Sequence, residues 1–154
     1  MSQAQSYANH SLYMASIMID AWRRAETVKE HAAPAIDAAF APATRLHLLN
    51  AYGWQLLACQ RVVNLPKDPP HSARALPSLA SGIAVSPEVR EMANLEQGGW
   101  LADLLSPIAP GLSPRRAQNV LAVTREQFDS ASAAEIYEKL EALIGRVADA
   151  IDES

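Results

Sequence analysis

The sequence has a single cysteine, Cys59, among its 154 residues, so an internal disulfide is excluded. A lone thiol is typical of a reducing compartment, and we therefore expect a cytoplasmic protein. No apolar run approaches the roughly 20 residues that a transmembrane helix needs, which predicts that the chain does not enter a membrane. Residues 1–10 also lack the basic and then apolar layout of a secretory signal.

Positive charge is scarce as well. The 13 lysines and arginines are outnumbered by 17 aspartates and glutamates, which gives a formal net charge of -4 at pH 7. The only adjacent basic pairs are Arg23-Arg24 and Arg115-Arg116, and neither belongs to a basic stripe. This charge pattern predicts that nucleic acid is not the partner of the protein.

Aromatic residues make up only 6% of the chain, whereas hydrophobic residues make up 49% and alanine is the most frequent of them. Alanine is the best helix former but fills little core volume, so this composition predicts an all-α fold. A chain of this length also suits one compact domain. We therefore expect a single helical domain over residues 1–154.

Hydrophobic periodicity predicts a bundle of three long helices, at about 6–30, from 35 or 42 to 64, and at 132–152. The start of the second helix stays open, because Pro34 and Pro42 would each suit the first turn of a helix. The third helix is expected to begin with a capping box formed by Ser132 and Glu135.

Short helices are predicted between residues 86 and 105. Ser86-Pro87-Glu88 combines an N-cap, a proline in the first turn and an acid near the helix N-terminus. The pair Gly98-Gly99 should end that helix, and 100–105 should form another that stops before Pro107. Residues 111–123 fit either a short helix or an extended segment lying over the core.

One glycine interrupts the apolar side of the second predicted helix. That side is formed by Leu46, Leu49, Gly53, Leu56, Leu57 and Val63. Glycine costs roughly 1 kcal/mol in helix propensity, and its missing side chain lets another element come close. We therefore expect a second helix to pack against Gly53.

The first predicted helix carries two neighbouring apolar stripes. One consists of Leu12, Ala15, Ile19, Trp22 and Ala25, and the other of Tyr7, Met14, Met18, Ala21 and Val28. An apolar face of this width is typical of a helix with two neighbours. Apolar surface that the bundle does not cover would be available to a partner.

The residue patterns of common enzymes and metal proteins are missing. No His-Glu-x-x-His pair and no Glu followed by His at the di-iron spacing occurs, and one cysteine cannot form a thiolate cluster. Cys59 lies within a helix on its apolar side, where a thiol behaves as a small hydrophobe. No Gly-x-Ser-x-Gly elbow or glycine-rich phosphate loop is present. We predict no catalytic residue, no metal site and no cofactor.

The spacing of Arg24 and His31 occurs in some helical bacterial ribonucleases. A polar residue usually follows the arginine in those enzymes, whereas Ala25 stands there in this chain. A ribonuclease-like enzyme is therefore the third of the functional interpretations below.

A polar seam lies beside the apolar side of the second predicted helix and is formed by His47, Asn50, Trp54 and Arg61. These four residues could form one wall of a ligand pocket, in which Trp54 supplies apolar area and the others bind polar groups. The alternative is a solvated flank, along which Trp54 is half-covered and Arg61 extends its charge into water.

Several short motifs follow one another along the chain: Tyr7, Asn9, Leu12-Tyr13, Tyr52-Gly53 in a leucine-rich helix, Leu65-Pro66, Ser86-Pro87-Glu88 and Trp100-Leu101. Their order resembles a family of short bacterial proteins classed as a domain of unknown function. The resemblance covers roughly Tyr7 to Val123. It implies an all-helical domain and supplies no activity, cofactor or catalytic residue.

The sequence thus favours a non-enzymatic helical module that binds proteins, as a homodimer or with another protein partner. A small-molecule or metal-binding bundle with a site near His47, Asn50 and Trp54 is the alternative.

Overall fold

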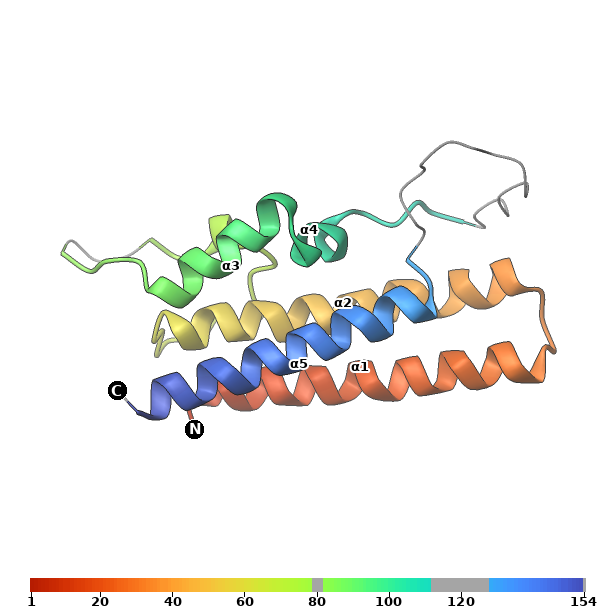
Figure 1. Ribbon diagram of the computed structural model, residues 1–154, viewed down its shortest axis with the longest axis horizontal. Coiled ribbons are helices and arrows are strands. Elements are labelled where there is room, and N and C mark those ends of the chain that lie inside the picture. The colour runs from red at the N-terminus through yellow and green to blue at the C-terminus, as the bar shows by residue number, and fades with distance from the viewer. Residues whose placement is uncertain (79–81, 112–127, 154) are drawn as a thin grey trace.

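The computed structural model describes residues 1–78, 82–111 and 128–153, and its regular structure is entirely helical (Figure 1). The elements are α1 (Gln3–Val28), α2 (Ala33–Cys59), a short 3₁₀ helix η1 (Ala73–Ala75), α3 (Pro87–Gly98), α4 (Trp100–Leu105) and α5 (Ser130–Asp152). The prediction of an all-α fold with three long helices and short helices between 86 and 105 is confirmed. Within the described ranges, no helix is long and apolar enough to cross a bilayer.

The three long helices lie side by side. α1 and α2 form an antiparallel hairpin and share the largest interface among the described helices. α5 packs against both of them and runs antiparallel to α1, so that the two chain ends are neighbours (Figure 1). α3 and α4 cover α2 on the side away from α1.

α1 begins and ends earlier than predicted. Its first turn is fixed by a capping box: the Gln5 amide donates to Ser2 Oγ at 3.2 Å, and the Ser2 amide donates to Gln5 Oε1 at 2.7 Å. At the other end, Lys29 adopts a left-handed conformation with φ 57°, which ends the helix at Val28. The predicted range 6–30 is therefore displaced toward the C-terminus.

α2 starts at Ala33 and continues through Pro42, so a start at residue 42 is wrong. A proline inside a helix leaves one carbonyl of the preceding turn without its amide donor. Pro42 is exposed, so water can reach the carbonyl that it leaves free. Two residues later, the Thr44 hydroxyl donates to the Phe40 carbonyl at 2.8 Å and adds a side-chain bond to this part of the helix.

α2 ends at Cys59 and does not reach residue 64. Arg61 has a left-handed φ of 56°, and the amides of Arg61 and Val62 each donate at 3.1 Å to carbonyls of the last helical turn. This is a Schellman ending, in which glycine usually holds the left-handed position. Val63 consequently lies outside the helix and is 87% exposed, so its assignment to the apolar side is wrong.

The core is centred on the second half of α2. Every residue from Ala51 to Cys59 is buried, because α1, α5, α3 and the connection after α2 surround this segment. A second cluster near the hairpin turn surrounds Trp22, whose Nε1 donates to Asp37 Oδ1 at 3.0 Å. Leu46, by contrast, is 48% exposed and does not join the core as predicted.

Gly53 contacts the proline-rich connection and not a second helix, so that expectation is corrected. A Cβ at this position would overlap the carbonyl oxygen of Pro70 and lie 2.9 Å from Pro69 Cβ. Nearby, a hydrogen bond from the Tyr52 hydroxyl to Glu96 and another from the Ala73 amide to the same carboxylate, at 2.7 Å, tie the connection to α2 and α3.

The short helices and α5 are set by their caps. Ser86 Oγ accepts from the Val89 amide at 3.2 Å, and α3 ends at Gly98, both as predicted. α5 starts at Ser130 and not at Ser132, because the carboxylate of Asp129 accepts from the Ser132 amide at 2.8 Å. The open question over residues 111–123 falls almost wholly on 112–127, outside the described residues.

Replacement of Gly53 by alanine tests the close contact with the connection. We expect Gly53→Ala to lower the free energy of unfolding by about 1 to 3 kcal/mol, because the added methyl group overlaps backbone atoms. Gly145 in α5 is the matched control, since nothing lies within 4 Å of a Cβ added there. Gly145→Ala should raise stability by about 0.5 to 1 kcal/mol in the same urea titration. Equal effects of both substitutions would contradict the contact.

Candidate functional site

The structure brings together three of the four residues of the predicted seam. His47, Asn50 and Trp54 lie on successive turns of α2, on the side that borders α1 and solvent. Arg61 lies beyond the end of α2 and lines a different groove, together with Val62 and Val63. The proposed wall of four residues is therefore divided between two places.

Trp54 is almost wholly covered. Its side chain is 8% exposed, and its ring lies against the Tyr7 ring of α1 with centroids 4.9 Å apart and planes tilted by 59°. This aromatic pair joins the N-terminal part of α1 to the middle of α2.

His10 of α1 lies close enough to His47 of α2 for their charges to interact. Burial lowers the pKa of His47, and the neighbouring His10 lowers it further, because two imidazolium charges repel. The arrangement holds His47 neutral to a lower pH than an isolated histidine.

Asn50 is engaged by the connection that follows α2. Nε2 of His71 lies 2.9 Å from Asn50 Oδ1, and since an amide oxygen only accepts, the imidazole donates. Burial lowers the pKa of His71, the charge of Arg45 lowers it further, and Asp68 acts in the opposite direction. Arg45 itself donates to the carbonyls that end α4, at 3.1 Å.

Around this seam, α1 and α2 present one continuous uncharged surface, which we call the hairpin face. It consists of Tyr7, His10, Met14, Ile17, Met18 and Ala21 of α1 and Ala43, Leu46, His47 and Asn50 of α2, with the buried Trp54 beneath Tyr7. Helical spacing places each set on one side of its helix. The Tyr7–Trp54 and His10–His47 pairs show that the two sides adjoin. Ile17 is 45% exposed there, close to the value for Leu46.

The nucleophile candidates are parts of the core. Cys59 is buried, and burial, the largest effect, together with the charge of Glu88 raises the pKa of its thiol to about 12, despite a hydrogen bond from Gln55. Burial and the bond to Glu96 likewise raise the pKa of Tyr52. Both groups remain protonated at neutral pH, which does not suit nucleophilic attack.

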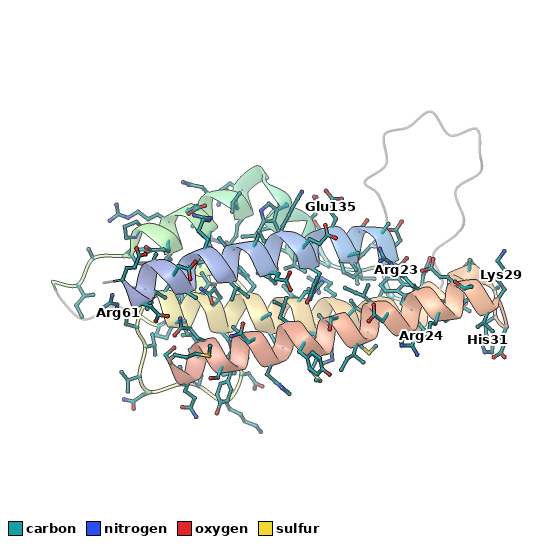
Figure 2. The ribbon with its side chains drawn as sticks, turned by 60° about the horizontal axis from the view of Figure 1, so that its bottom comes forward. Arg23, Arg24, Lys29, His31, Arg61 and Glu135 are labelled. Carbon is teal, nitrogen blue, oxygen red and sulfur yellow. The ribbon has the colours of Figure 1, made fainter. Side chains whose placement is uncertain are left out.

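Arg24 and His31 do not share an element. Arg24 lies in the last turns of α1, whereas His31 lies in the turn after that helix, and both are exposed (Figure 2). Among the described residues, no group of three or more His, Cys, Asp or Glu side chains is gathered as a metal ion would require.

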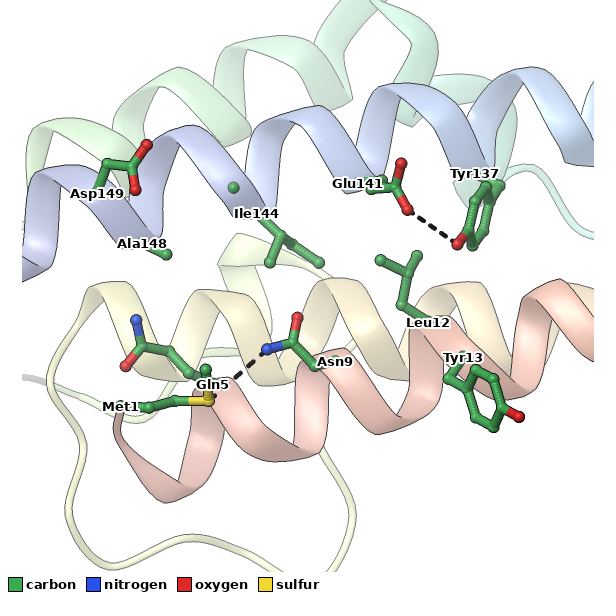
Figure 3. Close-up of a pocket in the computed structure, with 11 residues that line it drawn as sticks. Met1, Gln5, Asn9, Leu12, Tyr13, Tyr137, Glu141, Ile144, Ala148 and Asp149 are labelled. Atoms are coloured by element: carbon green, nitrogen blue, oxygen red, sulfur yellow. Dashed lines mark hydrogen bonds between the residues drawn. The ribbon is translucent and has the colours of Figure 1, made fainter.

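A groove between α1 and α5 was not anticipated from the sequence (Figure 3). It has a volume of about 410 Å³ and an apolar floor that includes Leu12, Ile144 and Ala148. Its polar groups are Gln5, Asn9 and Tyr13 from α1 and Tyr137, Glu141 and Asp149 from α5. The sequence feature that marks this groove is the pair of small residues Gly145 and Ala148, which lies between the acids Glu141 and Asp149. Small side chains leave the surface of α5 recessed there.

A second groove of about 410 Å³ lies where the N-terminus of α1 meets the end of α2. Arg61, Val62 and Leu65 line it, with Ile151 of α5. His47, Asn50 and Trp54 line neither of these two grooves.

Comparison with protein-family models, with curated proteins and with solved structures finds no match for this chain.

The lowered pKa values of His47 and His71 make stability depend on pH. In the unfolded chain these imidazoles bind protons near the ordinary histidine pKa of 6.5. In the folded protein they bind protons only at a lower pH. Stability from this source is therefore complete above pH 6.5 and is lost as the pH falls below it. We expect the melting temperature to decrease as the pH is lowered from about 7.5 to about 5.5. In the double variant His47→Gln, His71→Gln this decrease should be smaller.

The control for this measurement is His31→Gln, at an exposed position in the turn between α1 and α2. That substitution should leave the fall in melting temperature unchanged. The same pH profile for the double variant and the wild type would contradict the role of His47 and His71.

Proposed function

We propose that this protein is a non-enzymatic interaction module that pairs with a second copy of itself through the hairpin face. The observation that carries the proposal is an uncharged, partly apolar surface shared by two packed helices. Asp, Glu, Lys and Arg make up 19% of the chain, whereas this side of α1 carries none of them from Tyr7 to Ala21 and meets its first charge at Arg24. The centres of protein interfaces are likewise depleted in charge and enriched in methionine and aromatic residues.

The size of the face suits a reversible dimer. The stretch from Tyr7 to Ala21 extends about 22 Å along α1, and two helices side by side are about 20 Å wide. Side chains add to that flat area, which brings it near the lower end of specific interfaces, roughly 600 Å² per partner. We therefore expect the dimer to form and dissociate with concentration, whereas an obligate dimer would need a larger surface.

The rim of the face suits a two-fold pairing. Asp20 and Arg24 lie one turn apart on α1, are exposed, and flank Ile17 on the side away from α2. A two-fold contact pairs residue i of one copy with residue j of the other, and j with i. An antiparallel contact of two α1 helices centred on Met14 pairs Tyr7 of one copy with Ala21 of the other and leaves Asp20 and Arg24 at its edge, where water screens their charges.

Sedimentation velocity over a wide range of concentrations tests the proposal. We expect the wild-type protein to shift from monomer to dimer as its concentration rises. Ile17→Glu and Leu46→Glu should each keep it monomeric, because each would bury a charge in the interface. Both side chains are nearly half exposed in one copy, so the variants should fold, which far-UV circular dichroism checks.

Ile83→Glu is the matched control, since Ile83 is 58% exposed but lies before α3, outside the hairpin face. This variant should dimerise like the wild type. A wild-type protein that stays monomeric at every concentration would refute self-association. Equal dissociation of the Ile83→Glu variant would refute the assignment of the face.

A further inference from the structure

Two of the four histidines of the chain lie in the middle of the hairpin face. The contact between the rings of Tyr7 and Trp54 sets the level of the two antiparallel helices. Met14 follows Tyr7 by seven residues along α1. His47 precedes Trp54 by the same number along α2, so it lies level with Met14. His10 is exposed and lies one helical turn before Met14, so both imidazoles are near the centre of the face.

The neighbours of both imidazoles along their own helices are uncharged. Positions three and four residues away from His10 on α1 and from His47 on α2 are the nearest on a helix surface. They are occupied by Ser6, Tyr7, Tyr13, Met14, Ala43, Thr44, Asn50 and Ala51. Only the two tyrosines among them have titratable groups, so neither histidine has an acid one turn away on its own helix.

Charged groups surround the face without compensating a proton on these histidines. The groups nearest to it are Asp20 and Arg24 at the edge of α1, Arg45 of α2, and Asp68 and His71 of the connection. Arg45 is turned toward α4, where it donates to two carbonyls. The pKa of His47 is lowered by burial first and then by His10, and no carboxylate of the described residues raises it.

α5 keeps its acids on the other side of α1. Leu12 lies two positions from His10, which is the opposite side of the helix, and it lines the groove between α1 and α5. The titratable groups of α5 in that groove are Tyr137, Glu141 and Asp149. The hairpin face therefore receives no carboxylate from α5.

Self-pairing would cover both imidazoles. In an antiparallel contact centred on Met14, His10 of one copy lies opposite Met18 of the second copy, and His47 lies beside the two-fold axis. A neutral imidazole suits these surroundings. An imidazolium would lose its water there without gaining a carboxylate, and the like charges of the two copies would repel one another.

We propose that the hairpin face is a pH-sensitive interface, which pairs two copies while His10 and His47 are neutral and releases them when these imidazoles take up protons. This regulation rests on the proposed self-pairing through the same face. The separated copies bind more protons than the dimer does, so the dimer is most stable above the pH range in which histidine titrates. It is lost as the pH falls through that range, between about pH 8 and pH 5.

The overall charge of the chain acts with the opposite sign. The net charge is -4 at pH 7 with neutral histidines, and protonation of the four histidines would cancel it. Weaker repulsion between copies favours association in acid. A dimer that dissociates in acid therefore reports on imidazoles within the interface and not on the overall charge.

Sedimentation equilibrium at about pH 7.5 and about pH 5.5, at equal ionic strength and well below the melting temperature, tests the proposal. We expect the Kd of the wild-type dimer to rise at least tenfold at the lower pH. The loss approaches about a hundredfold if each copy must release one proton, because the two copies contribute equally. Far-UV circular dichroism at both pH values checks that the separated copies are folded.

The outcomes for the wild type separate the regulation from the self-pairing. A dimer with the same Kd at both pH values, or a tighter dimer at the lower pH, would overturn the regulation and leave the self-pairing intact. A protein that stays monomeric at both pH values and at every concentration would refute both.

Substitutions fix the charge at the two positions. The double variant His10→Gln, His47→Gln stays neutral, and we expect its Kd to change less than threefold between the two pH values. His10→Lys keeps a positive charge at both, so its Kd at about pH 7.5 should be at least tenfold higher than that of the wild type. His10 is exposed in one copy, so its substitution should not disturb the fold.

His31→Lys is the matched control, because it makes the same change at an exposed position in the turn between α1 and α2, outside the hairpin face. This variant should dimerise like the wild type at about pH 7.5 and dissociate like it in acid. Equal Kd values for His10→Lys and His31→Lys would overturn the assignment to the face. Dissociation of the double glutamine variant in acid, to the same extent as the wild type, would overturn the role of the two histidines.

Discussion

Burial of the second half of α2 on all sides is the constraint on which the rest of the structure depends. A helix that is apolar on one side needs one neighbour, but the segment 51–59 has α1, α5, α3 and the connection after α2 packed around it. Each neighbour turns its own apolar side toward this segment, which fixes the rotation of α1 and α5 about their axes. Even Gln55 is fully buried here, and its Oε1 has no partner among the described residues, which shows how strongly packing determines this region.

The same constraint explains which surfaces are left over. Because α1 turns Leu12, Ala15 and Ile19 toward the core, its second apolar stripe faces outward and joins the outer side of α2. α5 likewise buries Leu140 and Leu143, so its acids lie along the edges. The hairpin face and the α1–α5 groove are consequences of how the core is packed, and each lies on a rigid helix and not on a loop.

Periodicity predicted the helices because apolar spacing reports directly on the side of a helix that is buried. It failed at the ends, where caps decide. Arg61 and Lys29 take left-handed positions that glycine usually marks, and neither could be recognised as a helix end from its residue type. Pro34 and Pro42 suit a helix start equally well in the sequence, and only the structure shows that the helix continues through the exposed Pro42. Helical spacing placed His47, Asn50 and Trp54 of the polar seam on one side of α2, as the structure does. Arg61 does not join them, because the helix ends before it.

Gly145 and Ala148 mark a recessed stretch of α5 in the sequence, but the groove itself depends on the relative rotation and depth of two helices far apart in sequence. Gln5 illustrates the point: its spacing from Ser2 marks a capping box, yet only the approach of α5 makes the remaining amide group face a cavity. The same side chain therefore caps α1 and lines the groove. A function that resides in such pairs of helices leaves little trace in short motifs, since a helix pair aligns residues from distant parts of the chain. That is consistent with a chain whose recognisable patterns describe helices alone.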